Sequence, residues 1–362
     1  MVSVVLVIVK TLKHKYMKRL IVFILAVFVV LDGIAQQNAG TYAFANANSF
    51  ARVAALGGTS LPLYDSDLQV GLYNPSVITP DMHNCLTATY VDYFSDINLA
   101  TVQYSRTFNK AGSFLATVEY HNYGKMFEAS ESGVLGDRFS CNDFVITTGW
   151  GRQLGEKWSI GANFKFMGLQ YESYHAGAIA VDVAGSFHTE NGWVVSLAAR
   201  NVGMQLYNNF DTRFSPVPFK LELGASKRLA HLPLTIIVVY DDIQKWDKVY
   251  SDPLHLYDKY DESTGQVVEE KKGVKFAKNL MSHIVVGGEL NIGKHFALRG
   301  AFNYGQRRLL RAPETRSLVG FSVGMSLKVK MIEISYSRSR LSITNSPNYF
   351  TIALNLDEMK KK

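Results

Sequence analysis

The chain has 362 residues and a formal net charge of +7 at pH 7. Residues 1–35 hold five basic residues and one acid, which leaves the remaining chain near +3. So small a basic excess is only weak evidence for nucleic acid as a partner, and the export signal described next argues against that partner.

The N-terminus has the layout of an export signal. Residues 17–35 begin with two basic residues, continue with an apolar run of about a dozen residues and end with Gly33 and Ala35 at the positions of a cleavage site. The run is shorter than the roughly 20 residues of a membrane helix. We therefore predict a signal peptide over 1–35, with 1–16 as an upstream start artefact. A retained anchor is the alternative.

Most of the remaining chain alternates with a period of two, which predicts β-strands. In residues 158–171, Trp158 and Phe164 fall on one face, whereas Asn163 and Lys165 fall on the other. The polar faces of these segments are rich in Gly, Ser, Ala and Asn, and aromatic residues gather at the segment ends. This pattern is typical of an outer-membrane β-barrel, which is apolar towards lipid and polar towards its lumen.

We therefore expect an all-β fold, a transmembrane antiparallel barrel over 85–356. A secreted soluble β-sandwich is the alternative, because its strands also alternate. An even number of strands places both termini in the periplasm, including a short tail at 357–362. The sequence predicts about fourteen strands, namely 85–94, 97–108, 112–123, 141–153, 157–169, 176–188, 192–201, 217–229, 232–243, 281–293, 295–306, 316–327, 330–341 and 347–356.

The connections between the predicted strands alternate in length. Links such as 109–112 and 154–157 are short, whereas 124–140 and 244–280 are long. Link 95–96 is the exception, because it is brief on the side of the long links. Barrels of this type have short periplasmic turns and longer outer loops. The alternation therefore supports the barrel and its orientation.

Residues 36–84 precede the first predicted strand and include "SFARVAALGGT". The spacing predicts a short helix that ends at the glycine pair. A barrel of about fourteen strands is too wide for its own side chains to fill, since about eight strands can just do so. We therefore predict that 36–84 folds into the lumen as a plug; a loose periplasmic tail is the alternative. The plug residues singled out are Phe50, Arg52, Leu56, Gly57, Gly58, Asn74 and Pro75.

Arg52 is expected to meet an acid of the lumen, such as Glu119, Glu222 or Glu333. No motif of a catalytic, cofactor or metal site is present in the sequence, so we expect no enzyme activity and no cofactor. The pair Asp241–Asp242 is expected to be solvated, because adjacent side chains on a strand diverge.

Two of the predicted outer loops have a composition that suits binding. Segment 244–280 sets aromatic residues among charges, which is typical of a protein interface; a mobile lid is the alternative. Loop 307–316 is basic and suits the phosphates of lipopolysaccharide. Solvent-exposed arginines without a binding role are the equally expected alternative. The candidate contact residues are Trp246, Tyr250, Leu254, Tyr257 and Tyr260 in the first loop, and Arg307, Arg308 and Arg311 in the second.

Several segments resemble a known family. "FARVAALGGT" (50–59), followed by "YNPS" (73–76), resembles the start of the PorV/PorQ family of Bacteroidetes outer-membrane proteins. "RNVG" (200–203) and the closing "SPNYFTIALNL" (346–356) are more similar to the PorQ branch. The resemblance implies a relative of the FadL barrel fold, with an N-terminal segment folded into the lumen.

The resemblance also implies a role in type IX secretion, in which cargo crosses the outer membrane and is attached to the surface. The PorQ branch holds a surface-exposed partner, PorZ, alongside the sortase-like PorU and the shuttle PorV, and no catalytic residues come with it. The alternative is a FadL-like transporter or binder of a hydrophobic small molecule. A transporter needs an apolar pocket, whereas the predicted inward faces are small and polar, which favours the scaffold.

Overall fold

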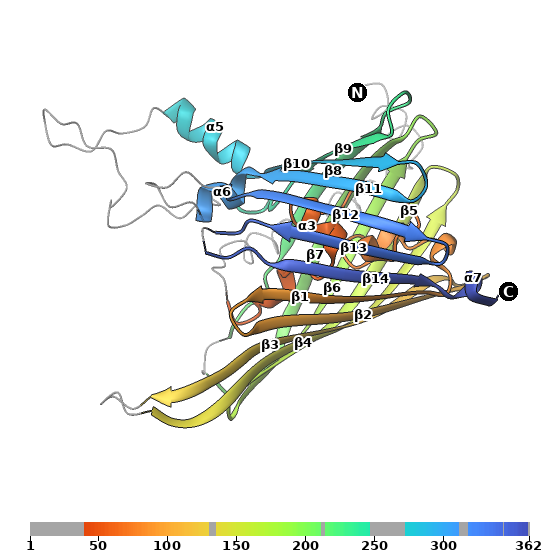
Figure 1. Cartoon of the computed structure of the whole chain (residues 1–362). Helices are drawn as coiled ribbons and strands as arrows, with labels where there is room; N and C mark the ends of the chain where they lie inside the picture. Colours follow the sequence, from red (N-terminus) through yellow and green to blue (C-terminus); the bar gives the residue numbers. More distant parts are fainter. Residues whose placement is uncertain are drawn as a thin grey trace, which may run out of the picture. The chain divides into compact units, whose positions relative to one another are not determined.

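The computed structural model describes residues 40–129, 135–210, 214–246, 272–310, 318–342 and 344–360. The predicted signal peptide therefore lies outside the described residues. Fourteen antiparallel strands form a closed barrel, in which each strand pairs with its neighbours along the chain and the first pairs with the last (Figure 1). The predicted fold class is confirmed, and closure of the sheet excludes the β-sandwich.

The strands are β1 (Cys85–Phe94), β2 (Ile97–Phe108), β3 (Gly112–Ala129), β4 (Leu135–Leu154), β5 (Trp158–Tyr171), β6 (Tyr174–His188), β7 (Trp193–Asn208), β8 (Lys220–Arg228), β9 (Leu234–Tyr240), β10 (Ile284–Ile292), β11 (Phe296–Asn303), β12 (Phe321–Val329), β13 (Ile332–Ser339) and β14 (Asn348–Asn355). The described helices are η1 (Ala43–Asn46), α3 (Ala51–Ala55), α4 (Leu68–Gly71), η2 (Pro75–Val77), η3 (Pro80–Met82), α5 (Lys272–Ser282), α6 (Tyr304–Leu310) and α7 (Leu356–Lys360). None of these helices is long and apolar enough to cross a membrane.

The two faces of each strand differ as the alternation predicts. In β5, Trp158 and Phe164 are exposed on the outside, whereas Asn163 and Lys165 are buried on the inside. Outward-facing Val, Leu, Ile and Phe side chains continue around the wall. An apolar surface of this extent is stable only in a non-aqueous environment, so the fold is that of an outer-membrane barrel.

The connections divide the barrel into a short-turn end and a long-loop end. Turns such as 293–295 and 330–331 lie at the short-turn end. The link between β9 and β10 is the longest at the other end, and the link at 95–96 is brief, as expected. One prediction is wrong here, because most of 124–140 is strand: β3 and β4 continue as a long hairpin (Figure 1).

Two helices replace predicted loop and strand at the long-loop end. The predicted strands over 281–293 and 295–306 are shorter in the structure, because α5 runs up to Ser282 and α6 begins at Tyr304. Lys, Leu and Met in α5 and Arg and Leu in α6 favour helix once no neighbouring strand pairs with these segments. Each of the two candidate binding loops, 244–280 and 307–316, therefore includes part of a helix.

The N-terminal segment from 40 to 84 lies within the barrel, where α3 contacts β11 to β14 and η2 contacts β4 to β6 (Figure 1). Most of its side chains are buried. The loose-tail alternative therefore does not hold for this segment, and the lumen is occupied by the chain's own plug.

Candidate functional site

The plug centres on the short helix α3. Phe50 precedes it and Leu56 follows it, and both side chains are completely buried. Gly57 and Gly58 end the helix with φ angles of 80° and 89°, a backbone region that favours glycine. A Cβ atom on Gly57 would lie 2.7 Å from Cγ1 of Val285 on the barrel wall, so a side chain at this position has no room.

Arg52 joins the plug to the wall through three carboxylates. Its guanidinium lies 2.5 Å from Oδ2 of Asp65, 2.9 Å from Oδ2 of Asp67 and 2.9 Å from Oε2 of Glu289 on β10. The Arg52 side chain is buried. Burial by itself would lower the pKa of this guanidinium, but the three carboxylates raise the pKa well above its ordinary value. Arg52 is therefore a permanently charged bridge between plug and barrel.

The predicted partners of Arg52 were wrong. Glu119 accepts a hydrogen bond from Ser49, Glu222 pairs with Arg200 and Lys220, and Glu333 lies 3.9 Å from Arg299. All three glutamates do face the lumen, but on strands other than β10, which carries Glu289, the wall acid that pairs with Arg52. A local signal for the actual pairing exists in "YDSD", because Asp65 and Asp67 follow α3 closely in the sequence.

A second contact between plug and wall is made by neutral groups. The Asn74 side chain accepts a hydrogen bond from the backbone N–H of Ser76 and donates to the carbonyl of Leu61 and to Oγ of Ser186 on β6, at 2.7 and 3.1 Å. Pro75 begins η2 and lies directly against the wall, where a Cβ on Gly161 would meet the Pro75 carbonyl oxygen at 2.2 Å.

Apolar contacts hold the beginning of the described segment near the long-loop end. Tyr42 and Phe44 are buried in a cluster that includes Met167 and Leu169 of β5. The ring of Phe44 also meets the His121 ring edge-on, with centroids 5.9 Å apart. The roles of these two aromatic residues do not follow from the sequence, because nothing in their local pattern distinguishes them from a loop.

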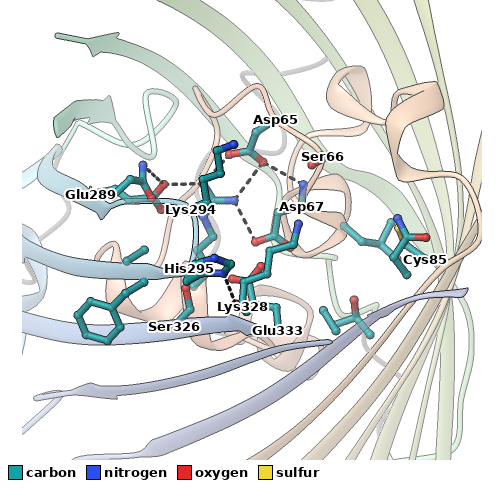
Figure 2. Close-up of a pocket in the computed structure, with 18 of the residues that line it drawn as sticks. Asp65, Ser66, Asp67, Cys85, Glu289, Lys294, His295, Ser326, Lys328 and Glu333 are labelled. Carbon is teal, nitrogen blue, oxygen red and sulfur yellow. Dashed lines mark hydrogen bonds and ion pairs between the residues drawn. The ribbon is translucent and has the colours of Figure 1, made fainter. Parts of the chain in front are cut away.

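A cavity of about 350 Å³ opens among residues of the short-turn end. Figure 2 shows Asp65 and Asp67 of the plug on one side of the cavity and Glu289 of the wall on the other. Lys294 and Lys328 also line it. The lining is thus charged, which suits water and ions better than an apolar molecule.

At the long-loop end, Trp246 packs its ring against Phe276 of α5, with centroids 5.2 Å apart. It is 43% exposed. Arg308 of α6 donates hydrogen bonds to Oδ1 of Asn279 and Oγ of Ser282, at 2.7 and 3.2 Å. Arg308 therefore ties the two helices together. Arg307 is half-buried in α6; Tyr250, Leu254, Tyr257, Tyr260 and Arg311 lie outside the described residues.

The prediction of a solvated Asp241 was wrong. Its side chain is buried, and Oδ1 lies 2.8 Å from Nζ of Lys220. Lys220 in turn lies 3.0 Å from Glu222, so Asp241 belongs to a network of charges on the lumenal wall. Within the described ranges, no group of three or more His, Cys, Asp or Glu side chains is placed to hold a metal ion.

No family model matches the sequence, and no curated protein matches it. Among solved structures, the chain is similar to the toluene transporter TbuX of Ralstonia pickettii, with 12% identity and a TM-score of 0.50 over 85% of this chain and 98% of that chain. It is also similar to a FadL homologue of Pseudomonas aeruginosa, with 11% identity and a TM-score of 0.48 over 85% of this chain and all of that chain. The toluene transporter TodX of Pseudomonas putida aligns at 10% identity and a TM-score of 0.47, over 85% and 97% of the two chains.

The likeness to TbuX is one of barrel fold. At 12% identity it concerns the fold alone, and a fold does not fix a function.

Proposed function

We propose that the protein is a non-enzymatic scaffold of the outer membrane, a plugged barrel whose long-loop end faces outward and holds a surface-exposed partner protein. The partner class is the one implied by the resemblance of "FARVAALGGT" and "YNPS" to the PorV/PorQ family. It is a PorZ-like protein of the type IX attachment machinery, with PorU-like and PorV-like components nearby. Lipopolysaccharide and other outer-membrane lipids surround the complex.

The observation that carries this proposal is the way the lumen is filled. Arg52 is bonded to carboxylates of both the plug and the wall, and Asn74 bonds the wall a second time. The cavity at the short-turn end is lined by charged side chains. A plug tied to the wall by charged and polar contacts supports a barrel that acts at its surface rather than one that passes apolar molecules.

Transport or binding of a hydrophobic small molecule is the second candidate. Two observations favour it: the fold is similar to that of a toluene transporter, and Phe44 occupies apolar wall surface next to Met167. The comparison taken alone favours this candidate over the scaffold. An apolar ligand that displaced Phe44 would find a site of matching chemistry there.

The test is mild detergent extraction of the tagged protein from its native outer membrane, followed by mass spectrometry of co-purified proteins and bound lipids. The scaffold predicts a stoichiometric surface protein and no apolar ligand. A barrel that is purified alone with a fatty acid or a similar molecule contradicts it and supports transport.

Substitution of two exposed tryptophans tests which end of the barrel binds the partner protein. Trp246 lies at the long-loop end, whereas Trp193 begins β7 next to a short turn at the opposite end. We expect Trp246→Ala to reduce the amount of co-purified partner and Trp193→Ala to leave it unchanged, because interfaces depend on a few aromatic anchors. An equal effect of both substitutions contradicts a partner site at the long-loop end.

A further inference from the structure

Helix α5 turns its apolar side away from the rest of the protein. Val274 and Met281 are each 45% exposed, and Leu280 is 38% exposed. Asn279 and Ser282, in contrast, are buried. Positions seven apart, such as 274 and 281, share one side of a helix, and positions 279 and 282 lie on the other side. A helix that packs on the core of a soluble protein has the opposite arrangement, with its apolar side buried and its polar side exposed.

Polar contacts fix α5 in this orientation. Asn279 and Ser282 accept the hydrogen bonds from Arg308 of α6, and Ser282 also donates to the carbonyl of Lys278 at 2.7 Å. Phe276 lies at the edge of the apolar side and meets the ring of Trp246. The helix therefore presents its apolar side outward as a built feature, because rotation about its axis would break the bonds to Arg308.

An apolar face of this kind is unfavourable in water. Removal of a Val, Leu or Met side chain from water is favourable, and three such side chains are exposed together on α5. The apolar face, defined here as Val274, Leu280 and Met281, therefore requires a covering phase or partner.

The charges on α5 indicate what that covering is. Lys272, Lys275 and Lys278 are the charged residues of the helix, and no acid occurs between 272 and 282. Lys272 and Lys278 flank the apolar face. Basic residues beside an apolar stripe are the pattern of a helix that lies in a membrane interface with anionic headgroups.

The position of α5 continues the lipid-facing surface of the barrel. The helix ends two residues before β10, whose outward Val286 is 44% exposed, and Val238 of the neighbouring β9 is 43% exposed. In Figure 1, α5 leaves the end of β10 and slopes away from the barrel wall. The apolar face of α5 therefore lies where an outer-membrane barrel emerges from its bilayer.

We propose that α5 lies on the outer leaflet, with its apolar face among the acyl chains and its lysines at the phosphates of anionic glycolipid headgroups. This site is separate from the surface partner of the proposed function and requires only the membrane-embedded barrel. It also assigns residues 272–282, which lie at the end of a predicted protein-binding loop, to lipid.

The test uses spin labels on the reconstituted full-length protein. The free cysteines Cys85 and Cys141 are replaced by serine, and single cysteines are introduced as Val274→Cys, Met281→Cys and Lys275→Cys. The three variants lie on one helix, and Lys275→Cys is the matched control on its polar side. Collision rates with oxygen, which concentrates among acyl chains, and with a water-soluble nickel chelate are measured in vesicles containing lipopolysaccharide.

The expected result is a higher ratio of oxygen to nickel collisions at 274 and 281 than at 275, with a lower ratio at 274 and 281 in vesicles of neutral phosphatidylcholine. Equal nickel access at all three positions overturns the proposal. Protection of 274 and 281 from both reagents also overturns it, because it indicates protein cover. If the cysteine-free barrel does not fold, Met281→Trp and Lys275→Trp are each compared with the parent protein in vesicles of brominated lipid. Beyond the quenching of the four native tryptophans, we expect additional quenched fluorescence in Met281→Trp and none in Lys275→Trp. No partner protein is present, so neither outcome bears on the scaffold.

Discussion

The two halves of the plug differ in whether an ionic contact is among those that hold them in the barrel. Near the short-turn end, Arg52 is bonded to three carboxylates at 2.5–2.9 Å. Near the long-loop end, Tyr42 and Phe44 pack on apolar wall residues. An ionic contact is directional and leaves uncompensated charges when one partner is lost, whereas an apolar contact can be replaced by any other apolar group. Apolar packing is common to both ends, since Leu68 and Met82 cluster with Leu115 and Ile237 of the wall, and the ionic contact of Arg52 is what sets the short-turn end apart.

The largest expected effect comes from breaking the ionic half. Arg52→Met removes the charge that Asp65 and Asp67 share, although Glu289 keeps its bond to Arg299 at 2.6 Å. Breaking a buried ion pair on one side costs about 3–5 kcal/mol. We expect a clear fall in the temperature at which the detergent-solubilised barrel loses its compact mobility on gels. We also expect new ion conductance in planar bilayers.

Arg152→Met is the matched control, because Arg152 is exposed on the wall. It removes an equal charge without touching the plug, so its unfolding temperature should stay at that of the parent protein. If Arg52→Met behaves like Arg152→Met, the ionic half is not what holds the plug.

The apolar half should respond to Phe44→Ala in a different way. Loss of a buried phenylalanine side chain costs about 3 kcal/mol of stability at the lower end of the usual range. Phe44 lies in η1, near the start of the described chain, so we expect the loss to loosen this segment and not the barrel. We expect faster hydrogen exchange over residues 42–47, with an unchanged unfolding temperature of the barrel. Phe214→Ala is the control, since Phe214 is 63% exposed at the same end of the barrel. A barrel that unfolds earlier in Phe44→Ala contradicts the separation of the two halves.

The same comparison shows what the sequence could predict. Alternation with a period of two distinguishes lumen from lipid, so the inward placement of Glu119, Glu222 and Glu333 follows from the pattern. It carries no information on which strand the plug helix leans against, and for this reason the partner of Arg52 was missed. Glu289 also faces the lumen, but only the packing of α3 against β11 to β14 brings this part of the wall close to Arg52.

Helices α5 and α6 were missed for a related reason. Most of α5 was predicted as outer loop and the start of α6 as strand, because short segments of this kind do not distinguish a helix from a strand or a loop. The outcome depends on whether a neighbouring strand continues beside them. Because β9 ends at Tyr240, β10 has no partner beyond Ile284 on that side, and the preceding residues fold as a helix bonded to Arg308.

The smallest effect is expected from a substitution of Gly57, which lies in the sequence between Arg52 and its plug partners Asp65 and Asp67. Gly57→Ala combines two costs: a left-handed backbone, at about 1–2 kcal/mol, and the contact of a new Cβ with Val285. Gly155→Ala has the first cost alone, because its φ is 76° and nothing lies within 4 Å of its Cβ position. We expect the unfolding temperature to fall more in Gly57→Ala than in Gly155→Ala.

A double-mutant cycle tests whether the additional loss of stability in Gly57→Ala, compared with Gly155→Ala, comes from the contact with Val285. Val285→Ala removes the Cγ1 atom that the new Cβ would approach. In that background Gly57→Ala should cost less than in the parent protein, although the Cβ of Ala301 still lies 3.3 Å from the new Cβ position. If the cost does not fall, the contact with Val285 is not its source, and a displaced plug backbone is indicated, which should weaken the bonds of Arg52 to Asp65 and Asp67 as well. The conductance that Arg52→Met is expected to produce would appear, at a lower level, in Gly57→Ala as well.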